Sequence, residues 1–185
     1  MEELFLMLSA IRPMGEELVN YLRSILVAVE LRKNQFLLKK GQVCNYIYFV
    51  KTGILRSFYT DENGKETTKW FMDEGNVITS VDSFFSRTPT LEPIHALEPS
   101  LLYGISHQQL FYAFENMDFS RHGIEILIRY HVLNERRISA LQRLSAAEKY
   151  LYTKQTQPNI VEKVPDKYLA TYLGITKETL SRIKN

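Results

Sequence analysis

The sequence has almost no cysteine, and its single Cys44 excludes disulfides within the chain, cysteine-ligated iron–sulfur clusters and zinc knuckles. No apolar run approaches the roughly 18 residues of a membrane-spanning helix. The N-terminus opens with acidic rather than basic residues, unlike a signal peptide. We therefore expect a cytoplasmic protein with no membrane partner and no cofactor, and we expect Cys44 to be a partly buried thiol on a strand.

Histidine is also scarce, with four residues in the chain: His95, His107, His122 and His131. Metal-dependent enzymes built on small β-rolls need several imidazoles and a carboxylate on adjoining strands. Only His95 falls within an expected strand, and the sequence shows neither a Ser/His/Asp set nor a phosphate-binding loop. We therefore expect no metal site, no catalytic residue and no enzymatic activity.

What remains is an ordinary globular composition with an uneven charge distribution. The 185 residues are 45% hydrophobic and 24% charged, enough for one sizeable domain and a small one. The net charge is only +2, but residues 163–185 hold five Lys or Arg against two acidic residues, whereas the other residues sum to −1. This small basic excess favours nucleic-acid binding by the C-terminal segment.

From about residue 31 to residue 106 the sequence predicts a rolled β-sheet. Glycines recur at Gly41, Gly53, Gly64 and Gly75, and between them lie short stretches rich in aromatic and β-branched residues, such as YIYFVK and ETTKWFM. Such regular turn signals are typical of a sandwich or barrel. Residues 61–64 predict a hairpin turn with positive φ at Asn63 and Gly64. The expected interior residues are Val43, Tyr46, Tyr48, Val50 and Phe58. The sheet could be structural support or could hold a small molecule in its mouth.

A long helix is predicted from a cap at Asp118 or Ser120 to about Leu144. One apolar stripe along it, with Ile126, Leu133 and Ala140, is expected to pack on the chain's own sheet. A second stripe has heptad spacing and favours contact with the same helix of a second subunit, although packing only on its own barrel stays an alternative. Its members are Ile124, Leu127, His131, Asn134, Ile138 and Leu141. A capping box at 145–148 predicts a new helix and a domain boundary.

The last twenty residues have the spacing of a helix-turn-helix. Gly174 suits the left-handed turn, and Thr176 can cap a second helix whose Leu180 faces back toward the first. Its outward side chains can reach phosphates and base edges in a major groove. The predicted DNA-binding residues are Thr176, Lys177, Glu178, Ser181, Arg182 and Lys184. A solvated helical hairpin is the alternative, because such hairpins are common.

Together with K-K-G-Q at 39–42, F-V-K-T-G at 49–53 and D-E-N-G-K-E at 61–66, this order of elements closely resembles the CRP/FNR family of bacterial transcription regulators over nearly the whole chain. The resemblance implies an α+β protein: an N-terminal double-stranded β-helix (jelly-roll) sensor domain over 1–117, a long dimerisation helix over 118–144, and a C-terminal helix-turn-helix domain over 145–185. It implies a homodimer that binds double-stranded DNA and senses a small-molecule effector. RNA polymerase is a candidate partner.

At the second helix, Lys177, Glu178 and Arg182 match the family's Arg-Glu…Arg base-contacting set, with Lys in place of the first Arg. Lysine contacts guanine as a point donor, so looser specificity is expected at that base. Family members also continue past this helix with a turn and often a β-wing. The sequence ends at Asn185, which we interpret as a shortened chain or a branch without a wing.

The effector site departs further from the family pattern. Members that bind cyclic nucleotides carry Gly-Glu and, some ten residues later, Arg-Ser around the ribose and phosphate. Those positions here are Thr79-Ser80 and Thr90-Leu91, which offer hydroxyls and an apolar group but no fixed cation. Arg87 is near in sequence but is expected to be a solvated loop residue. Because an unpaired buried phosphate is costly, we expect no cyclic AMP binding in the usual way. An interaction module of the same fold that no longer binds DNA is the alternative function.

Overall fold

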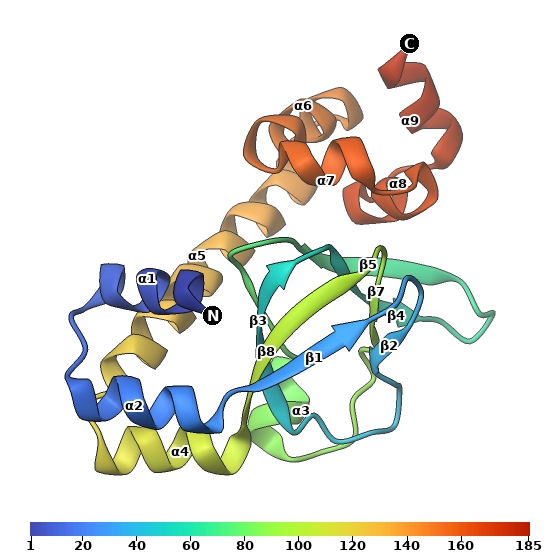
Figure 1. Cartoon of the computed structure of the whole chain (residues 1–185). Coiled ribbons are helices and arrows are strands. Elements are labelled where there is room, and N and C mark those ends of the chain that lie inside the picture. Colours follow the sequence, from blue (N-terminus) through green and yellow to red (C-terminus); the bar gives the residue numbers. More distant parts are fainter.

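The computed structural model describes residues 1–185 and has the α+β character that the sequence predicts (Figure 1). Two N-terminal helices precede the β-roll, and six helices follow it. The elements are α1 (Glu2–Ile11), α2 (Glu16–Ile25), β1 (Val27–Leu31), β2 (Phe36–Leu38), β3 (Tyr46–Thr52), β4 (Leu55–Thr60), β5 (Glu66–Met72), β6 (Val77–Ile78), α3 (Val81–Ser86), β7 (Ile94–Ala96), β8 (Ser100–Ser106), α4 (His107–Asn116), α5 (Ser120–Arg143), α6 (Ala146–Thr156), α7 (Pro158–Lys163), α8 (Asp166–Leu173) and α9 (Lys177–Lys184).

The β-roll consists of two four-stranded antiparallel sheets. Their strand orders are β1-β8-β3-β6 and β2-β7-β4-β5, so strands that are distant in sequence lie side by side in both. The sheets face each other but do not close into a barrel. Helix α3 interrupts the roll between β6 and β7. The sequence does not predict it, because the helix has only six residues and these show no clear apolar period.

The β4–β5 hairpin forms where the sequence predicts it, but with different turn chemistry. The Asp61 amide donates to the Lys65 carbonyl at 3.0 Å, and the Asp61 carboxylate accepts from the Asn63 and Lys65 amides at 2.9 Å each. Gly64 has a φ of +78°, whereas the φ of Asn63 is not positive. The prediction for Asn63 was wrong because the aspartate side chain ties a longer turn in which only one residue must enter the left-handed region.

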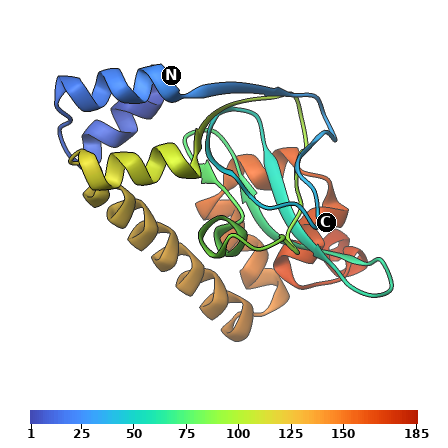
Figure 2. The ribbon, with the colours of Figure 1, turned by 90° about the horizontal axis from the view of Figure 1, so that it is seen from below.

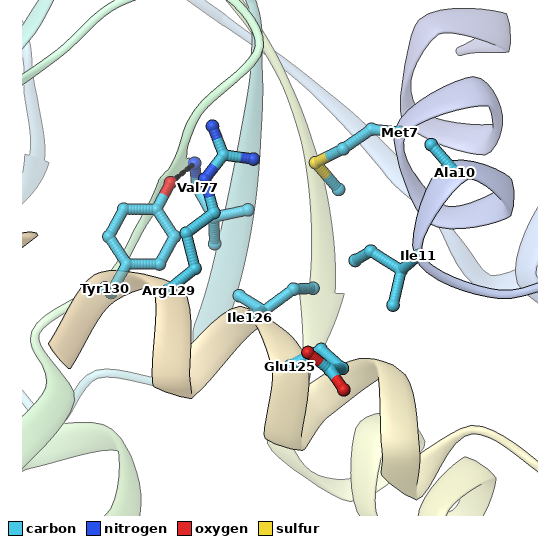
Figure 3. Close-up of a pocket in the computed structure, with 8 residues that line it drawn as sticks. All are labelled: Met7, Ala10, Ile11, Val77, Glu125, Ile126, Arg129 and Tyr130. Atoms are coloured by element: carbon cyan, nitrogen blue, oxygen red, sulfur yellow. Dashed lines mark hydrogen bonds between the residues drawn. The ribbon is translucent and has the colours of Figure 1, made fainter. Parts of the chain in front are cut away.

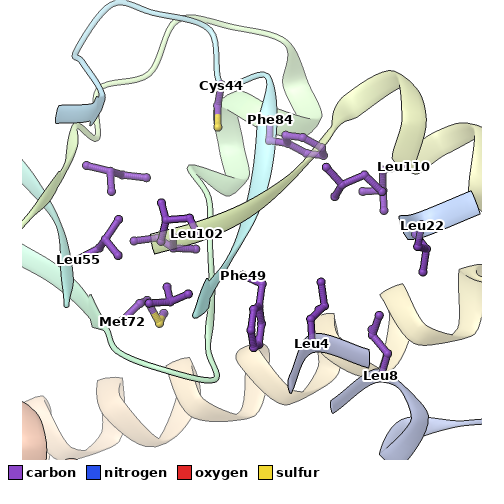
Figure 4. Packing of buried hydrophobic residues seen from close by; sticks show 14 of the residues in the cluster. Leu4, Leu8, Leu22, Cys44, Phe49, Leu55, Met72, Phe84, Leu102 and Leu110 are labelled. Atoms are coloured by element: carbon purple, nitrogen blue, oxygen red, sulfur yellow. The ribbon is translucent and has the colours of Figure 1, made fainter. Parts of the chain in front are cut away.

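Two hydrophobic cores divide the chain. The larger core joins the interior of the roll to α1, α2, α4 and α5 (Figure 4), and the smaller core joins α7, α8 and α9 to residues of β5 and two roll loops. Val50 and Phe58 are buried as predicted, whereas Val43, Tyr46 and Tyr48 are only half-buried. Cys44 is buried, but it lies in the loop before β3 and not on a strand.

Helix α5 runs beside the N-terminal helices and then past the roll to the C-terminal helices (Figures 1 and 2). Its observed bounds lie within a residue or two of the prediction, but the cap is Phe119, and no side chain caps the helix. The capping box predicted before α6 is present, with Ser145 and Glu148 bonding reciprocally. No helix is long and apolar enough to cross a membrane.

Candidate functional sites

The C-terminal helices α8 and α9 are joined by a tight turn at Gly174. This residue has φ of +65°, and the Thr176 hydroxyl accepts from the Thr179 amide at 3.1 Å, as expected for a glycine C-cap followed by a threonine N-cap. Leu169 and Leu180 are fully buried between the two helices. The local geometry that the sequence predicts for this segment is therefore present.

The outward face of α9 carries the side chains that were predicted to contact DNA. Thr176, Lys177, Glu178, Ser181, Arg182 and Lys184 are all exposed. Hydrogen bonds at the helix N-terminus lower the pKa of Glu178. The Lys184 amine is paired with the Asp166 carboxylate of α8, so Asp166 competes with a phosphate for its charge.

Helix α8 lies directly on strands β4 and β5, and buried Arg56 of β4 is central to this contact. Its Nε donates to the Thr68 hydroxyl at 2.8 Å, and an Nη bonds the Glu66 carboxylate at 2.6 Å. The guanidinium stacks between the Phe58 ring, at 4.2 Å, and the Tyr168 ring of α8, at 3.9 Å. Arg56 is thus fully buried beneath the C-terminal helices, and nothing in the sequence indicates this.

Polar contacts tie the same surfaces together. The Thr68 hydroxyl lies 2.9 Å from that of Thr171, and the Thr68 amide donates to Thr171 at 3.2 Å. From the other side, Arg137 of α5 donates to the Tyr172 carbonyl at 3.0 Å and lies over the Tyr172 and Trp70 rings, at 4.3 and 5.4 Å. The C-terminal helices are therefore held between the roll and α5 by two arginines.

The four predicted effector residues do not gather around one cavity. Ser80 and Thr90 are buried and bond each other at 2.8 Å, so both hydroxyls are already engaged. Thr79 bonds the Tyr46 carbonyl at 3.0 Å, and Leu91 is 68% exposed. Of the four, only Thr79 lines the main cavity, which lies between the roll, α5 and the N-terminal helices.

Arg87 is exposed, as expected, but its guanidinium is engaged in hydrogen bonds. It caps α3 in a left-handed conformation, with φ of +57°, and its guanidinium donates to the carbonyls of Cys44 and Phe84 at 2.7 and 3.2 Å. Arg87 therefore ties the end of α3 to the segment before β3. It does not line the cavity and supplies no cation to it.

A mainly apolar cavity of about 550 Å³ lies between the roll, α5 and the N-terminal helices. A charged pair that the sequence does not indicate lines this cavity. The amine of Lys69, on β5, donates to the Glu92 carboxylate at 2.7 Å. Burial alone would lower the pKa of Lys69, but the negative charge of Glu92 and its hydrogen bond outweigh this effect, so the pKa of Lys69 is raised. The only sequence signal was a lysine between threonine and tryptophan in a predicted strand.

A smaller pocket of about 330 Å³ separates α1 from α5 (Figure 3). Met7 and Ile11 of α1 face Ile126 and Tyr130 of α5, and the Tyr130 hydroxyl accepts from the Val77 amide at 2.7 Å. Ile126, from the stripe predicted to pack on the chain's own sheet, packs against the larger core where it faces α1, and Leu133 and Ala140 of the same stripe are half-buried. Tyr130, which sequence analysis did not single out, anchors α5 to β6.

The second stripe of α5 remains open. Ile124 and Leu127 are 56% and 55% exposed, and Ile138 is 39% exposed; His131 is also exposed, whereas Asn134 and Leu141 are half-buried. The exposed face is wider than predicted, since Ile128 and Val132 belong to it too. Ile124, Leu127, His131 and Asn134 also line the main cavity.

His95 lies on β7 as expected but is isolated from other metal-ligating side chains, and no three His, Cys, Asp or Glu residues come together in the chain. It is buried among Phe58, Phe36 and Tyr168, and its Nε2 has no hydrogen-bond partner. Burial, with a smaller effect from Arg56, lowers the pKa of His95 to about 4.

Residues 28–117 match the family model of the cyclic nucleotide-binding domain. The FixK2 structure from Bradyrhizobium japonicum is 18% identical with a TM-score of 0.73, covering 86% of this chain and 83% of FixK2. The Thermus thermophilus catabolite activator protein is 17% identical, with a TM-score of 0.59 and coverages of 94% and 84%.

The c-di-GMP responsive global regulator CLP from Xanthomonas campestris is 15% identical, with a TM-score of 0.65 and coverages of 91% and 89%. No curated protein matches the chain. At these identities, the structural likeness establishes the fold. Residues 28–117 are similar to the cyclic nucleotide-binding domain family, and the chain as a whole has a CRP/FNR-like fold.

Proposed function

We propose that the chain is a sequence-specific DNA-binding transcription regulator that acts as a homodimer. The carrying observation is the α9 surface: Leu180 anchors the helix in the small core, while Lys177, Glu178 and Arg182 stand exposed on its outer face. That arrangement suits insertion into a major groove. Two of the similar structures, CLP and a protein from Eubacterium rectale, are named as a global regulator and a transcriptional regulator, which supports this function over an interaction module that no longer binds DNA.

The open face of α5 supports the dimer. Exposed Ile124, Leu127 and Ile138 would be covered by the same face of a second copy, and polar His131 and Asn134 would fix the register. A two-fold pair of such chains would present two α9 helices to two half-sites, as helix-turn-helix dimers do. We place the boundaries of the sensor, dimerisation and DNA-binding parts at 117/118 and 144/145.

In the proposed regulator, the roll is the effector domain but does not bind cyclic AMP in the usual way. Ser80 and Thr90 bond each other, and Arg87 bonds backbone carbonyls, so none of them is poised for a phosphate. Lys69 lines the cavity, but its charge is already compensated by Glu92. We propose no enzymatic role for the chain.

The test of DNA binding compares Arg182→Ala with Lys184→Ala on an operator selected from random sequences and on unrelated DNA. Because Arg182 can contact a base edge, we expect Arg182→Ala to weaken operator binding by about 1–3 kcal/mol and to relax specificity at one base position only. Loss of Lys184 should weaken binding to all sequences about equally and reduce the salt dependence. Equal losses on operator and unrelated DNA for Arg182→Ala would remove it from the base-reading set.

A further inference from the structure

Most residues that line the main cavity are apolar, and three of the polar ones, Lys69, Ser57 and Glu92, lie on or next to the sheet that contains β4, β5 and β7. Lys69 and Ser57 come from the paired strands β5 and β4, and Glu92 comes from the segment before β7. Glu92 is 5% exposed, and its carboxylate bonds the Lys69 amine at 2.7 Å. The hydroxyl of Ser57, a residue that is 1% exposed, has no hydrogen-bond partner. A buried polar group without a partner is unusual in native proteins and calls for an explanation.

The ion pair determines which head groups this part of the cavity can accept. A carboxylate or phosphate placed on Lys69 would be repelled by Glu92, and an ammonium placed on Glu92 would be repelled by Lys69, at distances where burial leaves little screening. A neutral group with an acceptor beside a donor meets neither repulsion. It can accept from the Lys69 amine and donate to Glu92 without breaking the 2.7 Å pair.

The remaining wall determines the rest of the ligand. Trp70, Phe49 and Tyr103 line the cavity near the sheets, and Leu127 lines it on α5. A volume of about 550 Å³ falls within the range of small-molecule sites, which are mostly apolar with a few placed polar groups. An apolar body along these side chains would bring its head group to the ion pair.

We propose that the cavity binds an uncharged, mainly apolar molecule carrying one carboxamide-like group, and that Lys69, Glu92 and Ser57 together bind that group. The ion pair receives the donor and acceptor of the head group, and the Ser57 hydroxyl gains the partner it lacks. This inference rests on the proposed role of the roll as an effector domain. The residues that it assigns to ligand binding differ from Thr79, Ser80, Thr90 and Leu91, the positions that the sequence indicated.

The experiment uses the full chain and three straight-chain probes with eight carbons each: octanamide, octanoate and octylamine. Isothermal titration calorimetry at neutral pH should show saturable binding of octanamide and binding of the other two that is at least about tenfold weaker, because each charged head meets a like charge. Binding of octanoate or octylamine as tight as that of octanamide would overturn the proposal, and so would no saturable binding of any probe.

Variants separate the head-group contacts from general hydrophobic binding. Ser57→Ala should weaken octanamide about fivefold through the loss of one hydrogen bond. Glu92→Gln removes the repulsion and should improve octanoate binding at least about tenfold. Thr67→Ala, on the exposed face of β5, is the matched control and should change nothing. Unchanged octanamide binding in Ser57→Ala contradicts the assignment even if Glu92→Gln does not fold.

Operator binding by the unmodified chain is measured in parallel, so that the two proposals fail separately. Octanamide binding without DNA binding would refute the regulator and leave the cavity assignment intact. DNA binding together with failure of the octanamide series would refute the cavity assignment alone.

Discussion

The sharpest stability prediction concerns Arg56, whose buried guanidinium joins the β-roll to α8. Arg56→Met keeps most of the aliphatic stem but removes a charge-assisted bond to Glu66, a bond to Thr68 and stacking on the Tyr168 ring. A hydrogen bond to a charged group contributes about 1.5–3 kcal/mol, and one cation–π contact about 1 kcal/mol.

Two effects reduce this loss. Burial lowers the pKa of Arg56 against the opposing influence of Glu66, and one Nη has no partner, so the native arginine carries a desolvation cost that methionine avoids. The Glu66 side chain is 40% exposed and can be hydrated once its partner is gone. We therefore expect a net loss of about 2 kcal/mol in the free energy of unfolding.

The assay is urea unfolding followed by circular dichroism, with Arg32→Met as the control, because Arg32 is exposed and makes no ion pair. The control should stay within about 0.5 kcal/mol of the native protein. A double-mutant cycle with Tyr168→Leu isolates the contact with α8 and should give a coupling of about 1 kcal/mol. A coupling indistinguishable from zero would show that Arg56 stabilises the roll alone and does not hold the C-terminal helices.

Three further predictions follow from the buried imidazole, the open helix face and the cavity. Because the pKa of His95 is lowered from 6.5 to about 4, the unfolded chain takes up a proton first as pH falls, so stability should drop by about 3 kcal/mol from pH 6.5 to pH 4. His95→Phe should remove this slope, and exposed His131→Phe should keep it. Ile138→Asp should give a folded monomer with little operator affinity, and sedimentation showing a dimer would place the interface elsewhere. Millimolar cyclic AMP or cyclic GMP should give no saturable heat in calorimetry; micromolar binding would overturn the assignment of Thr79-Ser80 and Thr90-Leu91 to the family's nucleotide-binding positions.

Local signals in the sequence were sufficient for the elements that depend on neighbouring residues. The Ser145–Glu148 capping box, the Gly174 turn and the Thr176 cap all lie within four residues of their partners, and each forms as predicted. Likewise, the outward face of α9 follows from helical period alone, because the buried Leu180 fixes which side faces out.

Features made by contacts between distant segments escaped prediction. Thr68 and Thr171 are 103 positions apart, and nothing in the strand pattern shows that α8 would cover β5 and bury Arg56. The Lys69–Glu92 pair spans a turn, a helix and a loop, so neither residue suggests the other. The effector positions were placed from a family pattern, which locates Ser80 and Thr90 on the chain but does not reveal that their hydroxyls satisfy each other.

Helix α5 connects the two proposed activities physically. Asn134 lines the cavity, and Arg137, less than one helical turn further along, donates to the Tyr172 carbonyl of α8. An effector can change DNA affinity only if it contacts two arrangements of the chain differently. A tenfold change in operator affinity requires about 1.4 kcal/mol, which is slightly less than the contribution of one hydrogen bond to a charged group. In the proposed regulator, the gain or loss of the Arg137 contact alone is therefore large enough to carry a tenfold response from the cavity to the DNA-binding helices.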